Sequence, residues 1–257
     1  MSDAAIAARV RGLIDLTNLE ATCTPEAIDQ LCRRALQQQP PVPAVCVWPA
    51  FVAQAARLLR GSGVRVATVV NFPSGDESEA TTLAFTRAAL HDGADEIDLV
   101  LPYRAFLAGD VAAAEAMVRA VRAVVVAPAR LKVILESGEY PDLGAVRAAT
   151  QLAIGAGADF VKTSTGKTTH SASLDAVRVM LEAIVASGKP VGIKPSGGIR
   201  SLADAVAYLQ LADDVMGPQW ATAATFRFGA SGLLDAVDAA LGNANDAGAS
   251  SPEDSTY

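Results

Sequence analysis

Four charged residues lie within short apolar runs of the kind that form buried strands. They are Asp98 in EIDLV, Lys132 in LKVIL, Lys162 in FVKTS and Lys194 in VGIKP. Lysine and aspartate are almost never fully buried unless they are paired. One such strand would indicate an ion pair that fixes strand register. Four strands together favour a catalytic cluster, because perturbed charges concentrate at functional sites.

Two lysines and a carboxylate can together form and use a Schiff base. Burial and a neighbouring cation both lower the pKa of a lysine amine, which can then attack a carbonyl carbon. An ionised Asp98 can relay protons through a water molecule to the carbinolamine and the enamine. The imine then accepts electrons while a carbon–carbon bond breaks. Glu136 lies four residues after Lys132, and we expect it on the same face of that strand.

The sequence gives little support to metal chemistry. Its two histidines, His91 and His170, belong to no H-x-H or H-E-x-x-H pattern, and such spacings are what metal sites commonly use. We therefore expect neither a metal ion nor another cofactor.

Glycine- and serine-rich loops follow three of the expected strands. Lys162 opens KTSTGKTTH, Lys194 opens KPSGGIRS, and the last strand runs into GASGLL. Glycine lets the backbone approach a ligand closely, and the N-terminus of a helix attracts anions. Each loop could equally be a simple turn, but two adjacent ones favour a phosphate site. Lys167 fits either a phosphate contact or a solvated surface lysine.

The elements that would position these residues alternate regularly. Apolar runs predict eight strands, each followed by an alanine-rich segment with helical spacing: 13–17, 42–48, 64–71, 96–102, 131–137, 160–165, 191–195 and 226–229. This pattern predicts an α/β fold, a (β/α)8 TIM barrel with a short N-terminal helix. An open doubly wound sheet is less favoured because no G-x-G-x-x-G follows the first strand. We expect one domain over residues 1–242 and a flexible C-terminal tail over residues 243–257.

Composition excludes several classes of function. The 257-residue chain has a net charge of −7 and no basic run, which argues against nucleic-acid binding. No apolar segment approaches the ~18 residues of a membrane span. The three cysteines form no C-x-x-C pair, which is typical of reduced thiols in a cytoplasmic protein. The N-terminal residues lack the apolar run of a signal peptide.

Most of the chain resembles the family of deoxyribose-phosphate aldolases. The motifs that carry the resemblance are IDLT (14–17), AVCVWP (44–49), VATVVNFPSG (66–75), GADEIDLVLPYR (93–104), KVILESGE (132–139), GADFVKTSTGK (157–167), GIKPSGGIR (192–200) and RFGASGLL (227–234). The resemblance implies a barrel aldolase of class I. Such an enzyme reversibly cleaves 2-deoxy-D-ribose 5-phosphate into acetaldehyde and D-glyceraldehyde 3-phosphate.

The resemblance also implies catalytic roles. Lys162 matches the lysine that forms the Schiff base, Lys194 the lysine that lowers its pKa, and Asp98 the aspartate of the proton relay. Tyr257, the last residue, matches a tyrosine that assists proton exchange at the enamine carbon.

Further residues match positions in or near the substrate pocket. Asp15 and Thr17 match residues that contact substrate hydroxyl groups. Cys46 matches a cysteine near the pocket without an essential role, and Lys132 is expected near the pocket too. The positions that match phosphate-binding residues are Thr165, Gly166, Lys167, Gly197, Gly198 and Ser231.

One departure from the family concerns Gly232, where many members have a second serine. A hydroxyl contact to phosphate is lost there. We therefore hypothesise weaker phosphate binding and greater tolerance of unphosphorylated aldehydes.

Three other functions stay open on the sequence. A transaldolase-like enzyme would share Lys162 but use a larger donor. A phosphate-binding isomerase would use a carboxylate base without a covalent intermediate. A non-catalytic sensor of sugar phosphates is the third.

Barrels of this kind often dimerise through their outer helices, so a homodimer is a further hypothesis.

Overall fold

The computed structural model describes residues 3–37 and 39–249, and in this part of the chain eight parallel strands form one sheet. Neighbours in the sheet follow the order β7-β6-β5-β4-β3-β2-β1-β8. The strands are β1 (Ile14–Asn18), β2 (Ala44–Val47), β3 (Arg65–Val70), β4 (Glu96–Val100), β5 (Arg130–Ile134), β6 (Phe160–Lys162), β7 (Gly192–Lys194) and β8 (Phe228–Ala230). The predicted TIM barrel is confirmed.

Contacts between β7 and the segment of β8 close the barrel. Ile193 forms a parallel bridge with Phe226, and Ser196 forms another with Gly229. The amide of Gly229 donates to the carbonyl of Pro195 at 2.9 Å. Closure places the carboxyl ends of all the strands around one mouth, which is where barrels of this kind carry their active sites.

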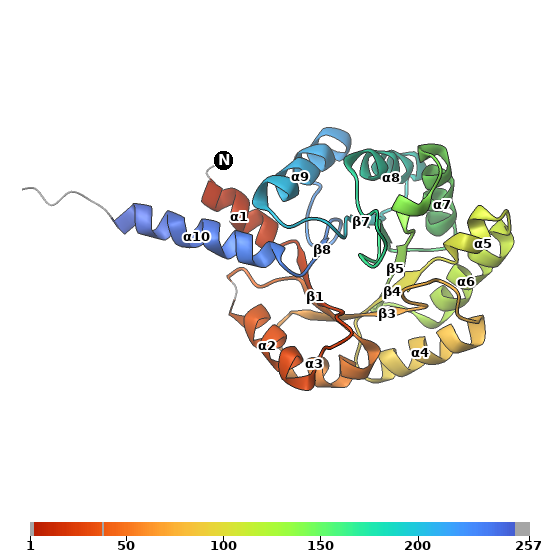
Figure 1. Cartoon of the computed structure of the whole chain (residues 1–257), viewed down its shortest axis with the longest axis horizontal. Helices are drawn as coiled ribbons and strands as arrows, with labels where there is room; N and C mark the ends of the chain where they lie inside the picture. The colour runs from red at the N-terminus through yellow and green to blue at the C-terminus, as the bar shows by residue number, and fades with distance from the viewer. Residues whose placement is uncertain (1–2, 38, 250–257) are drawn as a thin grey trace, which may run out of the picture.

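Helices surround the sheet on its outer side (Figure 1). The α-helices are α1 (Asp3–Arg11), α2 (Pro25–Leu36), α3 (Val52–Leu58), α4 (Glu79–His91), α5 (Tyr103–Leu107), α6 (Val111–Val124), α7 (Leu143–Gly155), α8 (Leu174–Ser187), α9 (Leu202–Met216) and α10 (Leu233–Ala249). Two short 3-10 helices, η1 (Pro49–Phe51) and η2 (Ser137–Glu139), follow β2 and β5.

Side-chain caps fix where several of these helices begin. Thr24 accepts a hydrogen bond from the amide of Ala27 at the start of α2. Ser201 and Asp204 form a reciprocal capping box at the start of α9. Such caps satisfy amides that have no partner within the helix. They therefore set the point at which each loop at the barrel mouth turns into its helix.

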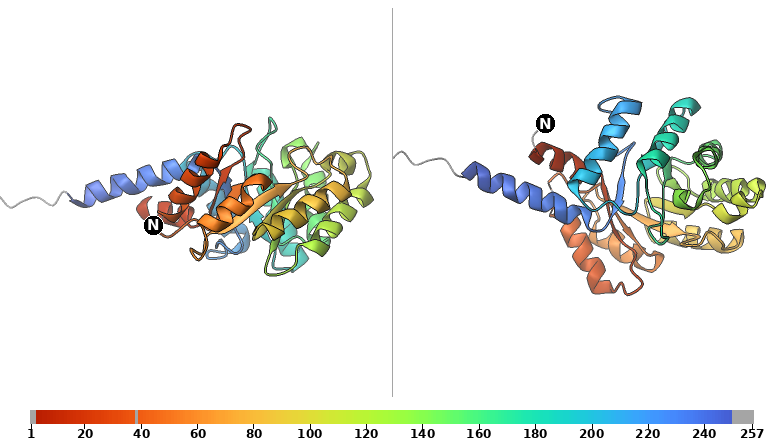
Figure 2. Two further views of the ribbon diagram at one scale, coloured as in Figure 1. Left: turned by 90° about the horizontal axis from the view of Figure 1, so that it is seen from below. Right: turned by 45° about the horizontal axis from the view of Figure 1, so that its top comes forward.

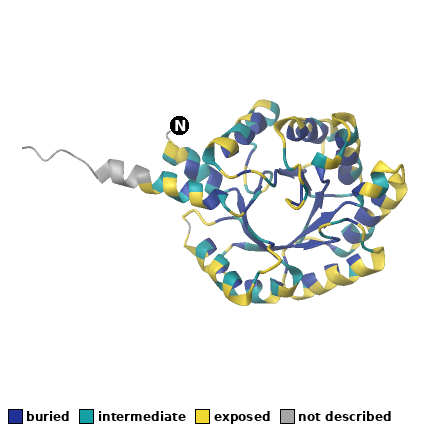
Figure 3. Ribbon diagram, in the orientation of Figure 1, coloured by how far each residue is buried: buried dark blue, intermediate teal, exposed yellow. Residues whose placement is uncertain are grey.

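The apolar core lies mainly between the sheet and the surrounding helices (Figure 3). The interior of the barrel differs, because charged side chains occupy it. Asp15, Asp98, Lys132 and Lys194 all have no exposed surface. The outer face of the sheet is therefore apolar, whereas its inner face carries charged side chains.

The N-terminal helix α1 packs against α10 and α9. Figure 2 shows α10 running out beyond the barrel beside α1. This helix continues past Gly242, where we expected the domain to end, and reaches Ala249. Tyr257 and the rest of the expected tail beyond Ala249 lie outside the described residues. Among the described residues, no helix has the length and apolarity needed to cross a lipid bilayer.

Candidate active site

Seven charged residues meet inside the barrel, and we call them the charge network: Asp15, Glu96, Asp98, Lys132, Lys162, Lys194 and Arg227. They come from β1, β4, β5, β6 and β7 and from the residue before β8. Sheet register brings them together, since Asp98 lies beside Lys132 and Lys162 lies beside Lys194. The three lysines that the sequence places within apolar strands thus surround the carboxylate of Asp98.

Asp98 lies at the centre of the network. Its Oδ1 atom accepts a hydrogen bond from Lys132 Nζ at 2.8 Å, and its Oδ2 atom accepts from both Lys162 Nζ and Lys194 Nζ at 2.9 Å. Burial alone would raise the pKa of this carboxyl group. The three ammonium groups outweigh burial and hold the pKa well below its usual range. Asp98 is therefore ionised.

Lys162 and Lys194 share Asp98 but differ in their other partners. Lys194 also pairs with Asp15 Oδ2 at 2.6 Å. Burial opposes its charge, but Asp15 and Asp98 outweigh burial and raise the pKa of Lys194. Burial lowers the pKa of Lys162 and the charge of Lys194 lowers it further, against the pull of Asp98. Lys194 is the permanent cation, and Lys162 is the amine that can lose its proton.

Lys162 lies at the edge of the network. Its side chain is 4% exposed, while those of Lys132 and Lys194 have no exposure. Its amine is therefore the one that a substrate in the cavity can reach.

Sequence reasoning missed Arg227 and Glu96 as members of this network. Arg227 binds Asp15 Oδ1 at 2.5 Å and Glu96 Oε1 at 3.1 Å. Glu96 also pairs with Lys132 at 2.6 Å. A signal was present for Glu96, because it lies two residues before Asp98 on β4 and side chains along a strand alternate between faces.

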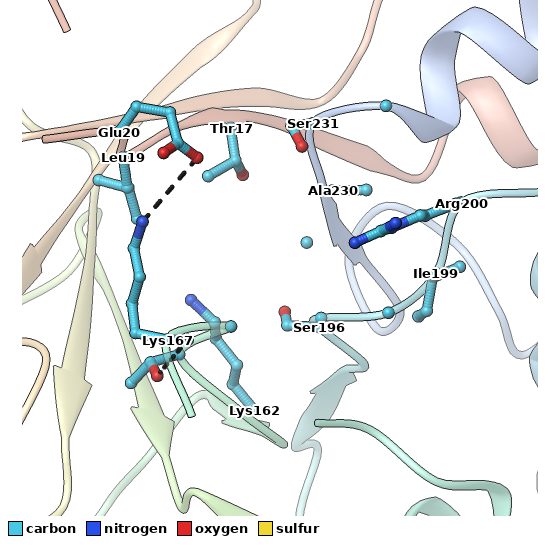
Figure 4. Close-up of a pocket in the computed structure, with 16 residues that line it drawn as sticks. Thr17, Leu19, Glu20, Lys162, Lys167, Ser196, Ile199, Arg200, Ala230 and Ser231 are labelled. Atoms are coloured by element: carbon cyan, nitrogen blue, oxygen red, sulfur yellow. Dashed lines mark hydrogen bonds and ion pairs between the residues drawn. The ribbon is translucent and has the colours of Figure 1, made fainter. Parts of the chain in front are cut away.

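A cavity of about 370 Å³ opens above Lys162 at the barrel mouth. Its walls come from the ends of β1, β6, β7 and β8 and the loops that follow them. In Figure 4 the amine of Lys162 points into this cavity from below, with Ser196 and Arg200 on one side and Thr17 and Ser231 above. The only member of the charge network among the described lining residues is Lys162.

The upper part of the cavity is built mainly from loops. The predicted phosphate-binding residues Thr165, Gly166, Lys167, Gly197, Gly198 and Ser231 all line it. Gly197 and Gly198 have φ values of 82° and 79°, a conformation that favours glycine. Lys167 Nζ lies 3.9 Å from Glu20 Oε1 across the mouth. Such a rim of backbone groups and one ammonium group suits an anion.

Two further lining residues, Ser196 and Arg200, were absent from the sequence-based set. Ser196 is 4% exposed, and its hydroxyl has no hydrogen-bond partner among the described residues. It occupies the space beside Gly229, where a Cβ atom would overlap Ser196 Oγ. Arg200 adds a second cation to the rim. Both follow Lys194 within KPSGGIR. This motif could therefore have predicted that they lie close to the site.

Several predicted residues lie beneath or beside the cavity. Asp98, Lys194 and Lys132 have no exposed surface, and Asp15 is buried with its carboxylate bound to Arg227 and Lys194. Thr17 does line the cavity and donates its hydroxyl to the carbonyl of Asp15 at 2.8 Å.

Cys46 is buried on β2 next to the network, and burial raises the pKa of its thiol. It is therefore a neutral neighbour of the charged groups. No group of three or more His, Cys, Asp or Glu side chains in residues 3–37 and 39–249 is arranged to hold a metal ion.

Glu136 does not lie where its spacing from Lys132 predicts. Strand β5 ends at Ile134, and Glu136 has a left-handed backbone with φ 58°. Its carboxylate accepts hydrogen bonds from Thr165 and Thr168 instead of joining Lys132. The expectation was wrong because strict alternation of side chains ends with the strand.

Comparison with known proteins agrees with this geometry. Residues 11–249 match the model of the DeoC/LacD family of aldolases. The chain belongs to this family. It is 54% identical over 232 residues to the deoxyribose-phosphate aldolase of Agrobacterium fabrum, a match that covers 90% of each chain.

Solved structures show the same fold. A crystal structure from Coccidioides immitis, provisionally assigned as a deoxyribose-phosphate aldolase, has a TM-score of 0.81 and 31% identity and covers 91% of this chain and 86% of that one. The deoxyribose phosphate aldolase of Aeropyrum pernix, described as tetrameric, has a TM-score of 0.75 and 27% identity and covers 93% of this chain and 92% of that one. The family members thus share this barrel across nearly its whole length.

Proposed function

We propose that this aldolase reversibly cleaves 2-deoxy-D-ribose 5-phosphate into acetaldehyde and D-glyceraldehyde 3-phosphate through a Schiff base on Lys162. The observation that carries the proposal is a lysine of lowered pKa that points into the cavity beneath an anion-binding rim. The similarity to the aldolase of Agrobacterium fabrum supports the choice of substrate.

The reaction begins when the neutral amine of Lys162 attacks the aldehyde carbon of the open-chain sugar. Loss of water from the carbinolamine gives an iminium ion. Lys162 Nζ lies 2.9 Å from Asp98 Oδ2, so this carboxylate lies beside the atoms that gain and lose protons. Through a water molecule it can accept a proton from one group and return it to another.

Cleavage then uses the iminium ion as the electron acceptor. The C3 hydroxyl loses its proton, the bond between C2 and C3 breaks, and its electron pair forms the enamine on Lys162. D-Glyceraldehyde 3-phosphate leaves. Protonation of the enamine carbon and hydrolysis of the resulting iminium ion release acetaldehyde and restore the amine. Lys194 retains its proton throughout and disfavours a second positive charge on Lys162 before the substrate arrives.

The rim holds the other end of the substrate. Lys167, Arg200 and the backbone around Gly197 and Gly198 line the part of the cavity formed by loops. A phosphate held there leaves the aldehyde carbon free to approach Lys162 below. The proposed roles of Asp15, Thr165 and Tyr257 rest on the family resemblance alone.

Trapping with borohydride tests the mechanism. Incubation with acetaldehyde and sodium borohydride should add one ethyl group to Lys162, which peptide mass mapping would locate. The Lys162→Arg variant should lose both the adduct and the aldolase activity, since a guanidinium group stays protonated. An adduct of equal yield in Lys162→Arg would refute the assignment.

The rival functions give different results in the same experiment. A transaldolase-like enzyme should trap dihydroxyacetone-type donors in preference to acetaldehyde. An isomerase with a carboxylate base should keep its activity in Lys162→Arg, and a sensor of sugar phosphates should form no adduct.

We also propose a cytoplasmic location, because Cys23, Cys32 and Cys46 are all free thiols. We further propose a homodimer formed through outer helices. The relative from Aeropyrum pernix is described as a tetramer, which supports self-association. Analytical ultracentrifugation of the purified protein would decide the oligomeric state.

A further inference from the structure

Glu136 lies at the end of β5 in a conformation that a non-glycine residue rarely adopts. Its φ and ψ values are 58° and 54°. This left-handed backbone is unfavourable for side chains with a Cβ atom and persists where surrounding contacts hold it. Its carboxylate is fully buried. The proposed chemistry does not use this residue.

Among the described residues, the hydrogen bonds to the Glu136 carboxylate come from the loop between β6 and α8. The amide of Thr165 donates to both carboxylate oxygens, at 3.2 and 3.3 Å. The hydroxyl of Thr165 donates to Oε2 at 2.5 Å, and that of Thr168 donates to Oε1 at 3.2 Å. Burial raises the pKa of Glu136 while these hydrogen bonds oppose the rise. The group is an acceptor surrounded by donors.

Thr165 passes this restraint to the rim of the cavity. Its hydroxyl oxygen accepts a hydrogen bond from the amide of Lys167 at 3.0 Å. Both donors of Thr165 are directed at Glu136, so Thr165 serves to fix the loop. Gly166 and Lys167 follow it along the cavity wall, and the Lys167 ammonium group is the cation that this loop offers to an anion.

The residues next to Glu136 contact the same loop at its two ends. The amide of Ser137 donates to the carbonyl of Thr163 at 2.8 Å. Gly138 packs so closely on the carbonyl of His170 that a Cβ atom would overlap it. Residues 136–138 thus hold the loop from its root at Thr163 to its far side at His170.

We propose that Glu136 is a positioning residue for phosphate recognition, which acts through Thr165 and Thr168 to hold Gly166 and Lys167 over the cavity. A carboxylate suits this role because it accepts from several donors and has none of its own to satisfy. The inference rests on the proposed function, since it concerns the phosphate end of the same substrate. It assigns Glu136 no contact with the reacting carbon atoms.

Replacement of Glu136 by glutamine is the main test. Glu136→Gln keeps the volume but turns one acceptor into a donor that faces the donors of Thr165. We expect KM for 2-deoxyribose 5-phosphate to rise about tenfold while kcat changes less than about twofold, the pattern of weakened binding. For unphosphorylated 2-deoxyribose, kcat/KM should stay unchanged.

A matched pair at Thr168 guards against misfolding of that variant. Thr168→Val removes the hydroxyl that donates to Glu136, whereas Thr168→Ser keeps it. The valine variant should raise KM for the phosphorylated sugar by roughly threefold, about the effect of one weak hydrogen bond. The serine variant should match the wild type.

Two results would overturn the inference. Equal losses on the phosphorylated and unphosphorylated sugars would assign Glu136 a general structural role. An unchanged KM for the phosphorylated sugar in both Glu136→Gln and Thr168→Val would leave it without a role.

Titration with inorganic phosphate separates this inference from the proposed function. If the wild type cleaves neither sugar, the proposed function fails, but calorimetry can still compare phosphate binding. Weaker phosphate binding by Glu136→Gln than by the wild type would then support the positioning role. Equal dissociation constants would refute it.

Discussion

The charge network and the rim differ in structure and in task, although Lys162 of the network lines the same cavity as the rim. The network consists of side chains on strands, and Asp98, Lys132 and Lys194 have no exposed surface. The rim consists mainly of loop backbone, and Gly166, Gly198 and Ser231 are exposed. In the dry interior each charge acts strongly on its neighbours, whereas water weakens charges at the rim. Reactivity is therefore set in the interior and substrate choice at the rim.

The difference also predicts how each region tolerates change. Removal of one charge from the network shifts the balance of all the others, since each carboxylate binds two or more cations. Removal of one contact at the rim leaves the remaining donors in place. Substitutions in the interior should alter kcat and pH dependence, and substitutions at the rim should alter KM.

The largest effect is expected from Lys194→Met. Without Lys194 the Asp98 carboxylate keeps only Lys132 and Lys162 as partners among the described residues, so it favours a protonated Lys162 more strongly. The pKa of Lys162 should rise, because the cation that lowers it is gone. The acid limb of the profile of kcat/KM against pH should move to higher pH, and activity at neutral pH should fall by at least about a hundredfold.

The control for this prediction is Lys194→Arg, which keeps the positive charge. Its acid limb should stay near that of the wild type, even if its larger side chain slows the reaction. An acid limb that does not move in Lys194→Met would show that burial alone activates Lys162.

A smaller effect is expected where the network meets the rim. Gly229→Ala would place a Cβ atom against Ser196 Oγ and 3.0 Å from Lys194 Cε. Overpacking of this kind costs about 1–3 kcal/mol of unfolding free energy. Ser196→Ala in the same background should restore part of it by removing the overlapping oxygen.

Urea denaturation of the two single variants and the double variant measures this coupling. If the two changes were simply additive, the close contact between Gly229 and Ser196 would have no energetic consequence.

The smallest effect is expected at the outer rim. A Cβ atom on Gly232 would meet nothing within 4 Å, so Gly232→Ser should fold normally and offer one more hydroxyl to the phosphate. We expect KM for 2-deoxyribose 5-phosphate to fall about threefold, with 2-deoxyribose unaffected. Gly232→Ala is the control without the hydroxyl. Equal losses of efficiency in wild type and Gly232→Ser when the substrate phosphate is removed would contradict the prediction.

Much of the fold could be predicted from the sequence, because strands and helices follow local patterns of apolar residues. Eight apolar runs matched the eight strands, although the strands are shorter than predicted at most ends. Phe160–Lys162, for example, was predicted to reach Thr165. Thr163 still bonds to the backbone of Lys194, but Thr165 directs its amide and hydroxyl at Glu136 instead of at a neighbouring strand. Helix α10 continues to Ala249, although the polar residues after Gly242 favoured a tail from residue 243.

Part of the site could be predicted from the sequence, because charged residues are rare within apolar strands. Lys162, Lys194, Lys132 and Asp98 stood out for that reason, and the structure brings them together. Arg227 was hidden because FRFG was interpreted only as the last strand. The direction of Glu136 was hidden too, since a left-handed residue after a strand has no signature in its spacing from Lys132.

The pairing of Arg227 with Asp15 joins residues 212 positions apart in the chain. This contact cannot form until the last strand has met the first. Without Arg227, the carboxylates of Asp15 and Glu96 would lose one of their cations and would favour a protonated Lys162 more strongly. We therefore expect the lowered pKa of Lys162 to require the closed barrel, in which β8 pairs with β1.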